Sequence, residues 1–134
     1  MIANLANASA LLGQYLTEIN WVGFYLWKED QLVLGPFQGW PACVRIAFGK
    51  GVCGTAVAQG RTQLVADVHA FPGHIACDAR SRSEIVVPMF DATGKISGVL
   101  DIDSPKLSRF DETDKRWLEE FVGILTGVKI PAQV

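Results

Sequence analysis

Several classes of protein are disfavoured by what this chain lacks. No run of about 18 apolar residues occurs, so the sequence predicts no membrane span, and the N-terminal stretch lacks the basic region of a signal peptide. The net charge is −2 and the basic residues are scattered, which argues against a nucleic-acid partner. Three cysteines are too few for a disulfide scaffold. We therefore expect a cytoplasmic protein that binds neither membranes nor nucleic acids.

The cysteine spacing also argues against a metal centre. Cys43, Cys53 and Cys77 follow the pattern C-x9-C-x23-C and contain no C-x-x-C motif, which disfavours a structural zinc site. His74 and Cys77 offer two ligands without obvious companions, and His69 is expected to be a solvated loop residue. In a reducing compartment the thiols are then buried, or take part in redox chemistry.

The composition suits one compact domain. The chain has 134 residues, of which 49% are hydrophobic and 19% are charged. We assign residues 1–134 to a single domain with a sizeable core.

Hydrophobic periodicity predicts helices at both ends and strands between them. The expected elements are a helix over 2–19, a hairpin of strands 21–27 and 32–34, a loop over 35–42, a short strand over 43–46, a glycine-rich turn opening a helix within 48–60, a strand over 62–65, a loop from 69, a strand over 85–90 with a bulge or edge at Pro88, a strand within 96–105 and a helix over 111–126. Terminal helices around an antiparallel sheet make an α+β domain.

Alternation along the strands predicts two different sheet faces. Val22, Phe24 and Leu26 share one face, and Trp21 and Tyr25 share the other. Leu100 and Ile102 continue the aliphatic face, which both helices require. The expected helix stripes are Ile2, Leu5, Leu12, Leu16 and Ile19 in the first helix and Trp117, Phe121, Ile124 and Val128 in the last, with Asp111 as N-cap. The aromatic face is left for a ligand.

Acidic residues lie on that second face. Asp101 and Asp103 are two residues apart on one strand, and Glu84 opens the neighbouring strand. Such a pair is normally solvated, but acids next to Trp21 and Tyr25 suit a polar or cationic small ligand such as an amino group. Crowded carboxylates repel, so one of them is expected to hold a proton near neutral pH.

The cysteines differ in their surroundings. Cys77 lies in a polar loop beside His74 and Arg80, where cations favour the reactive thiolate. Cys53 follows a helix start, which is expected to lower its pKa, and Cys43 lies in an apolar strand typical of a core cysteine. Local electrostatics alone do not rank Cys77 above Cys53.

Five segments together resemble GAF domains, and specifically the free methionine-(R)-sulfoxide reductases. They are NWVGFYL (20–26), GPFQGWPACVRIAFGKGVCGTA (35–56), HAFPGHIACDARSRSEIVVP (69–88), GVLDIDSP (98–105) and RFDETDKRWLE (109–119). The resemblance implies a GAF-like sheet with both terminal helices on one face and the pocket on the other. Trp40 departs from the lysine or similar polar residue expected there, and family members usually carry more sequence before the first helix.

The resemblance also implies a reaction without metal or organic cofactor. Cys77 would attack the sulfoxide sulfur, and Cys43 would be the main resolving cysteine with Cys53 as an alternative. The acids Glu84, Asp101 and Asp103 would hold the substrate ammonium and assist protonation of its oxygen, and Trp21 and Tyr25 would enclose its methyl-sulfur end. A thioredoxin-like donor would reduce the disulfide, and a homodimer is the family expectation.

Two other interpretations remain open from the residues. A GAF sensory module that binds a small molecule would need no cysteine chemistry. An interaction subunit would use the aromatic face for a partner, although Asp101 and Asp103 would be costly to bury there. Neither alternative predicts a substrate-dependent disulfide.

Overall fold

A computed structural model describes residues 1–130, so the last four residues of the expected single domain 1–134 lie outside the described part. The elements, in chain order, are α1 (Ile2–Tyr15), β1 (Trp21–Lys28), β2 (Gln31–Gly39), β3 (Arg45–Ala47), α2 (Gly51–Gln59), β4 (Gln63–Val65), the 3₁₀ turn η1 (Val68–Ala70), β5 (Ser83–Phe90), β6 (Ile96–Ser104) and α3 (Glu112–Thr126). Among these described residues, no helix is both long and apolar enough to cross a membrane.

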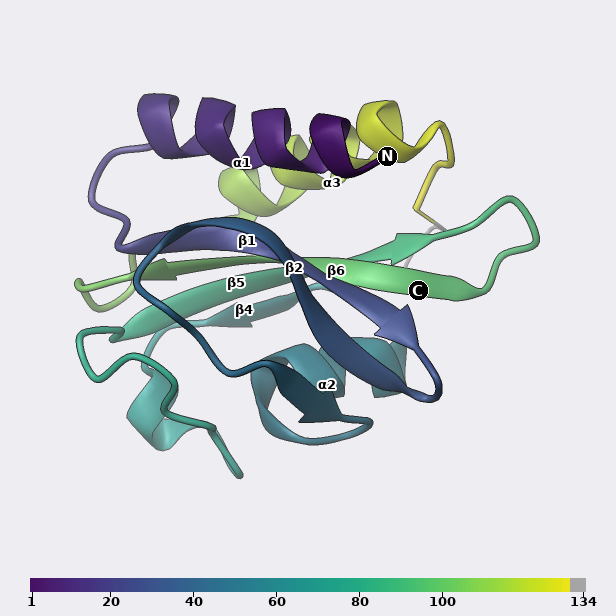
Figure 1. The fold of residues 1–134 in the computed structure, drawn as a ribbon. Coiled ribbons are helices and arrows are strands. Elements are labelled where there is room, and N and C mark those ends of the chain that lie inside the picture. The colour runs from purple at the N-terminus through teal and green to yellow at the C-terminus, as the bar shows by residue number, and fades with distance from the viewer. Residues whose placement is uncertain (131–134) are drawn as a thin grey trace.

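The strands form one antiparallel sheet of six in the order β3-β2-β1-β6-β5-β4. The helices α1 and α3 cover one face, and α2 lies under the other face together with the segment that leads into β5 (Figure 1). The expected α+β architecture, with both terminal helices on one face, is therefore confirmed.

Side chains on the helix-covered face form an aliphatic core. Val22 and Phe24 of β1 pack there with Leu100 and Ile102 of β6, as the alternation predicted. These four side chains are at most 1% exposed. The burial of this apolar surface is the main driving force that holds α1 and α3 on the sheet.

The predicted stripe of the last helix is confirmed at Phe121, which is half-buried against the core, and is wrong at Trp117 and Ile124. Leu118 and Val122 are the buried residues of α3, whereas Trp117 is 52% and Ile124 is 85% exposed. Trp117 instead stacks on Phe121 at a centroid distance of 5.9 Å. The helix contains two adjacent apolar stripes, and only its placement on the sheet decides which of them is buried.

The helix boundaries confirm one prediction and correct another. Asp111 caps α3 in a reciprocal capping box, in which its side chain accepts from the Asp114 backbone and Asp114 accepts from the Asp111 backbone, both at 2.9 Å. The first helix ends at Tyr15 rather than residue 19, because Leu16 already adopts an extended conformation. Ile2 is 62% exposed and does not belong to the buried stripe.

Two strands also differ from expectation. Residues 35–39 continue β2 instead of forming a loop, with Gly39 opposite Trp21. The register shifts between Gly23 and Tyr25, where β2 contains one extra residue. Gly23 is required there, because a Cβ atom would overlap Phe37. Pro88 lies beyond Gln63, the first residue of β4, and pairs only with Val99 of β6, so the predicted edge position is confirmed.

Candidate active site

A disulfide joins two loops at the second face of the sheet. Cys43 and Cys77 are bonded across 34 residues of sequence, with their Cα atoms 5.6 Å apart. Cys43 precedes β3 and is not part of a strand, which corrects the expected strand over 43–46. Cys53 is the remaining free cysteine and is buried. The disulfide brings together segments that the sequence separates by α2 and β4.

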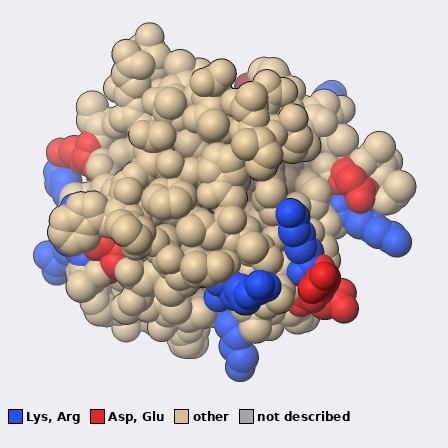
Figure 2. Space-filling model, in the orientation of Figure 1, with Lys and Arg blue, Asp and Glu red and all other residues tan. Residues whose placement is uncertain are grey.

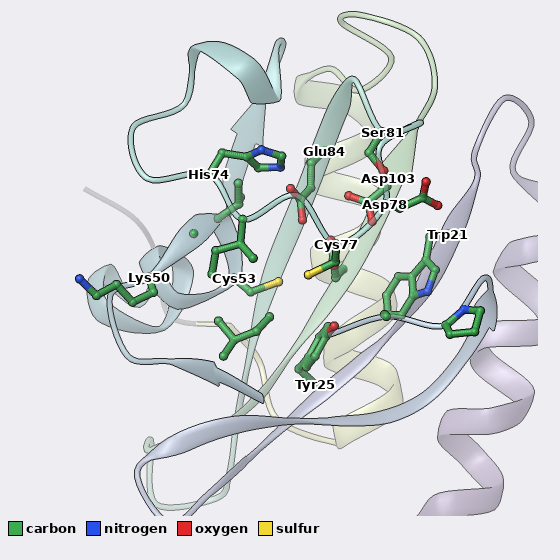
Figure 3. A pocket seen from close by; sticks show the side chains of 17 residues that line it. Trp21, Tyr25, Lys50, Cys53, His74, Cys77, Asp78, Ser81, Glu84 and Asp103 are labelled. Atoms are coloured by element: carbon green, nitrogen blue, oxygen red, sulfur yellow. The ribbon is translucent and has the colours of Figure 1, made fainter. Parts of the chain in front are cut away.

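Cys77 of the disulfide forms part of the wall of a pocket between α2 and the sheet. Most of the predicted site residues line this pocket. Figure 3 shows the side chains of Cys53, Cys77 and Glu84 pointing toward its interior, whereas the Lys50 amine extends away from it. The predicted lining residues are Trp21, Tyr25, Cys53, Cys77, Glu84, Asp101 and Asp103. The free volume is about 50 Å³, which holds a few water molecules. The pocket is therefore narrow in the disulfide form.

Three acidic side chains meet inside this pocket. Glu84 of β5 lies opposite Asp103 of β6 in the sheet register, and Asp101 lies on the same face two residues before it. Glu84 and Asp101 are each 6% exposed, and Asp103 is half-buried. The sheet itself therefore holds the three carboxyl groups at fixed spacing.

Burial raises the pKa of all three carboxyl groups. The pKa of Glu84 lies well above its ordinary value because of desolvation and the nearby charges of Asp101 and Asp103. The pKa of Asp103 is raised well above its ordinary value by burial and by the charge of Asp101. Burial also raises the pKa of Asp101, while contacts with Glu84 and Cys53 act in the opposite direction. The direction of these shifts agrees with the expectation that one carboxyl group holds a proton, and Asp101 is the carboxyl group best able to keep its charge.

Asp101 also presents an unsatisfied acceptor to the pocket. Its Oδ1 atom is buried and receives no hydrogen bond from the residues that the structure describes. A buried carboxylate oxygen without a donor is costly, so this atom is suited to a donor supplied by a ligand.

Cys53 does not have the lowered pKa that its helix position predicted. The residue is 4% exposed, and burial together with the nearby charges of Asp101 and Glu84 raises its pKa well above the ordinary value. Desolvation outweighs the helix N-terminus, so this thiol stays protonated. The ligand atoms of Cys53, Glu84 and Asp101 lie within 4.8 Å of one another, and this group could hold a metal ion.

The aromatic wall is tied to the loop that carries Cys43. The Trp21 ring stacks on Tyr25 with a centroid distance of 5.9 Å, and its Nε1 atom donates to the Trp40 carbonyl at 3.1 Å. The Tyr25 hydroxyl donates to the Cys43 carbonyl at 2.8 Å. Both aromatic residues therefore hold the loop in place in addition to lining the pocket.

A polar network after Cys77 went unassigned in the sequence. The Asp78 carboxylate accepts two hydrogen bonds from the Arg80 side chain, at 3.1 and 2.7 Å, which lower the pKa of Asp78 to about 2. Asn20 donates from Nδ2 to Asp78 and to Ser81, each at 3.1 Å. The Asp-x-Arg spacing after Cys77 was the available signal. The cation expected to favour a Cys77 thiolate is thus already paired with a carboxylate.

The histidines take no part in the acid cluster. The His69 side chain is 67% exposed, as expected for a solvated loop residue. His74 lines the pocket entrance, and partial burial together with the nearby His69 lowers its pKa.

Comparisons with known proteins agree with this geometry. The GAF domain family model matches residues 4–126, and the free methionine-R-sulfoxide reductase of Escherichia coli (strain K12) is 58% identical over 127 residues, which cover 95% of this chain and 76% of that protein. The chain belongs to the free methionine-R-sulfoxide reductases of the GAF domain family. The reduced form of fRMsr of Staphylococcus aureus superposes with a TM-score of 0.92 at 64% identity, covering 95% of this chain and 82% of that one.

A ligand-bound relative has the same fold. The free methionine-R-sulfoxide reductase of Neisseria meningitidis, solved in complex with its substrate, superposes with a TM-score of 0.91 at 55% identity over 94% of this chain and 75% of that chain. Both the GAF resemblance and its more specific form, the reductase family, are therefore confirmed.

Proposed function

We propose that this chain reduces free methionine-(R)-sulfoxide to methionine. The observation that carries the proposal is the Cys43–Cys77 disulfide in the wall of a pocket that contains three carboxyl groups with raised pKa values. Two thiols that join as a disulfide supply two electrons, and a protonated carboxyl group supplies a proton to the sulfoxide oxygen. Reduction of a sulfoxide requires both.

In the proposed reaction, Cys77 is the nucleophile. Its thiolate attacks the sulfoxide sulfur while Asp103 donates a proton to the sulfoxide oxygen. The resulting hydroxyl group passes to the Cys77 sulfur as the bond between the two sulfurs breaks, which gives methionine and a sulfenic acid on Cys77. The thiol of Cys43 then condenses with the sulfenic acid, forming the disulfide and releasing water. The raised pKa of Asp103 favours this role, because the carboxyl group must be protonated when substrate binds.

Cys43 is the main resolving cysteine in this scheme. It already lies at bonding distance from Cys77. Cys53 is the alternative partner, but its raised pKa leaves little thiolate to attack a sulfenic acid. We therefore assign Cys53 a secondary part in resolution.

The remaining pocket residues recognise a free amino acid. The unpartnered Asp101 Oδ1 atom is suited to the substrate ammonium, and Glu84 lies beside it in the cluster. Trp21 and Tyr25 enclose the methyl-sulfur end from the other side. A methionine sulfoxide inside a peptide has no free ammonium and would lose the contact with Asp101, which favours the free amino acid.

The need for an external reductant follows from the disulfide chemistry, and the homodimer is the family expectation. We propose that a thioredoxin-like protein reduces the disulfide by thiol exchange in the cytoplasm, that no metal or organic cofactor takes part, and that the chain forms a homodimer. The two thiols released when the disulfide is reduced provide the electrons, and the carboxyl cluster delivers a proton to the sulfoxide oxygen.

The decisive test is the loss of each methionine sulfoxide diastereomer separately, with dithiothreitol or thioredoxin as reductant. Wild type is expected to consume only the free R form, and Cys77→Ser is expected to consume neither. Turnover that survives in the variant would move the attack to Cys43 or Cys53. A folded wild type without turnover would instead favour the GAF sensory module.

A further inference from the structure

Exposed apolar side chains lie on both sides of the Cys43–Cys77 disulfide. Val44 follows Cys43 directly and is 60% exposed, and Trp40, three residues before it, is also 60% exposed. Ile75 precedes Cys77 by two residues and is 39% exposed. Since consecutive Cα atoms are about 3.8 Å apart, each of these Cα atoms lies within roughly 11 Å of a disulfide cysteine. Large apolar side chains grouped around a reactive bond indicate a surface that contacts another protein.

The same surface is basic, although the chain as a whole has a net charge of −2. Residues 31–66, which contain Cys43, include Arg45, Lys50 and Arg61 and no acidic residue at all. Residues 68–83, which contain Cys77, include two arginines and a single acid, which is paired with one of them at 2.7 Å. Figure 2 shows Lys and Arg side chains gathered over the part of this face where α2 lies in Figure 1. Of the acids near the disulfide, Asp78 is paired with Arg80, and Glu84 and Asp101 are buried in the pocket.

We propose that this surface, formed by Trp40, Val44, Arg45 and Ile75 around the disulfide, is the docking site for a protein dithiol with an apolar surface beside its reactive thiol and acidic residues around it. The inference rests on the proposed function, because it concerns the partner that returns the disulfide to two thiols. Apolar contact provides the binding energy at the centre, and the basic rim steers an acidic partner toward it.

The exchange balances without any other reactant. A thiolate of the partner attacks one sulfur of the Cys43–Cys77 bond, a mixed disulfide forms, and the displaced cysteine leaves as a thiolate that takes up a proton. The second thiol of the partner then attacks its own sulfur in the mixed disulfide. The partner leaves oxidised, and the chain regains two thiols with the two electrons and two protons that the partner has lost.

The stacking of Arg80 on Trp40 helps to keep this surface in place. The guanidinium carbon of Arg80 lies 3.5 Å from the Trp40 ring centroid, so the stack joins the Cys77 loop to the Cys43 loop independently of the disulfide. The two apolar sides of the docking surface can therefore stay together while the bond between the cysteines is opened.

The test uses the purified full chain with its disulfide formed, and compares reduced bacterial thioredoxin with dithiothreitol. The rate at which the Cys43–Cys77 disulfide is reduced is measured by quenching at timed intervals and counting free thiols by mass spectrometry. Opening means reduction of this disulfide. Val44→Ser is expected to slow opening by thioredoxin about threefold to tenfold. Arg45→Glu is expected to slow it about tenfold at low ionic strength, with most of the difference lost at high salt. Opening by dithiothreitol should be unchanged in both variants.

Two matched controls lie away from the disulfide. Ile124→Ser removes an apolar side chain that is 85% exposed on α3, and Lys95→Glu reverses an exposed charge at the β5–β6 turn. Thioredoxin should reduce the disulfide of both control variants at the wild-type rate. Equal rates for all four variants would overturn the docking surface, and so would parallel slowing with dithiothreitol. Sulfoxide turnover with dithiothreitol is measured on the same samples, so that failure of the proposed function is seen separately.

Discussion

The two faces of the sheet are built from the same strands but are used differently. On one face, Phe24 and Leu100 are completely buried against α1 and α3 in an aliphatic core. On the other face, the neighbouring residues of the same strands include Tyr25 and Asp101, which line the pocket under α2. Successive side chains of a strand point to opposite faces, so one stretch of sequence serves stability and chemistry at once.

The two faces differ in how many polar side chains they bury and in whether those side chains have hydrogen-bond partners. Ser9 is buried on the helix-covered side, but its hydroxyl donates to the Leu5 carbonyl at 2.8 Å and is satisfied within α1. The pocket side buries Glu84, Asp101 and the Cys53 thiol near one another, and the Asp101 Oδ1 atom has no donor among the described residues. One face therefore stabilises the fold, and the other holds groups whose burial costs free energy and whose pKa values are raised as a result. Substitutions on the two faces should separate these two properties.

The largest effect is expected on the pocket side from the nucleophile itself. Cys77→Ser should bring turnover below detection with any reductant, because a missing nucleophile cannot be rescued by a better electron donor. The free energy of unfolding of the reduced protein should change little. Methionine formation is measured by chromatography, and Cys53→Ser should retain measurable turnover. Equal losses in the two variants would contradict the separate roles.

A smaller loss is expected from the proposed proton donor. Asp103→Asn should lower kcat about 10²-fold to 10⁴-fold, the usual contribution of general acid catalysis. Wild-type kcat should fall as pH rises through the raised pKa of this carboxyl group, whereas the variant should lack that fall. Asp111→Asn makes the same change at the α3 N-cap, where asparagine also caps well, and should leave kcat unchanged. Near-normal kcat in Asp103→Asn would remove its assigned role.

On the helix-covered face, the expected effect is on stability alone. Leu118→Ala should lower the free energy of unfolding by about 2–5 kcal/mol, because it leaves a cavity beside a side chain that is only 1% exposed. At a temperature where the variant is still folded, kcat should equal that of wild type. Denaturant titration and activity on the same samples measure both quantities. A selective loss of kcat would show that the two faces are coupled.

The carboxyl cluster predicts a pH dependence of stability that is smaller still. Glu84 and Asp103 have higher pKa values in the folded chain than in the unfolded chain, so the native state binds more protons between those values. Stability contributed by these protons is present below the ordinary carboxyl pKa and is lost as pH rises, by up to about 1.4 kcal/mol per pH unit for each extra proton. Urea titrations from pH 4 upward test the slope, which should be shallower in Asp103→Asn.

The smallest effect, none at all, is expected from removal of metal ions. Cys53, Glu84 and Asp101 could together hold a cation, but the proposed reaction does not use one. Dialysis against a chelator should leave kcat and the melting temperature unchanged. Restoration of lost activity by a single divalent cation would assign this cluster a metal instead.

Periodicity predicted the features of the fold that depend on neighbouring residues. The placement of Trp21, Tyr25, Asp101 and Asp103 on one face follows from a repeat of two along each strand, and the structure confirms it. The cap of α3 by Asp111 likewise depends only on its own first turn. Such features require no knowledge of what packs against the element.

Predictions failed where a distant partner decides the outcome. The short strand over 43–46 begins two residues later, because Cys43 is bonded to Cys77 and its carbonyl accepts from Tyr25. The continuation of β2 through residues 35–39 depends on pairing with β1, against the local turn preference of glycine and proline. The buried stripe of α3 depends on where that helix rests on the sheet.

For the candidate site too, some features follow from the local sequence and others depend on distant residues. The sequence by itself determined which chemical groups are available, namely three thiols, three acids on one sheet face and an aromatic wall, because residue type and strand alternation are local properties. Only the tertiary structure decided that Cys43 pairs with Cys77, that the thiol of Cys53 stays protonated and that burial raises the pKa of the acids. Bond formation and desolvation depend on which atoms surround a group in space, and those atoms come from α2, β5, β6 and two loops that are far apart along the chain.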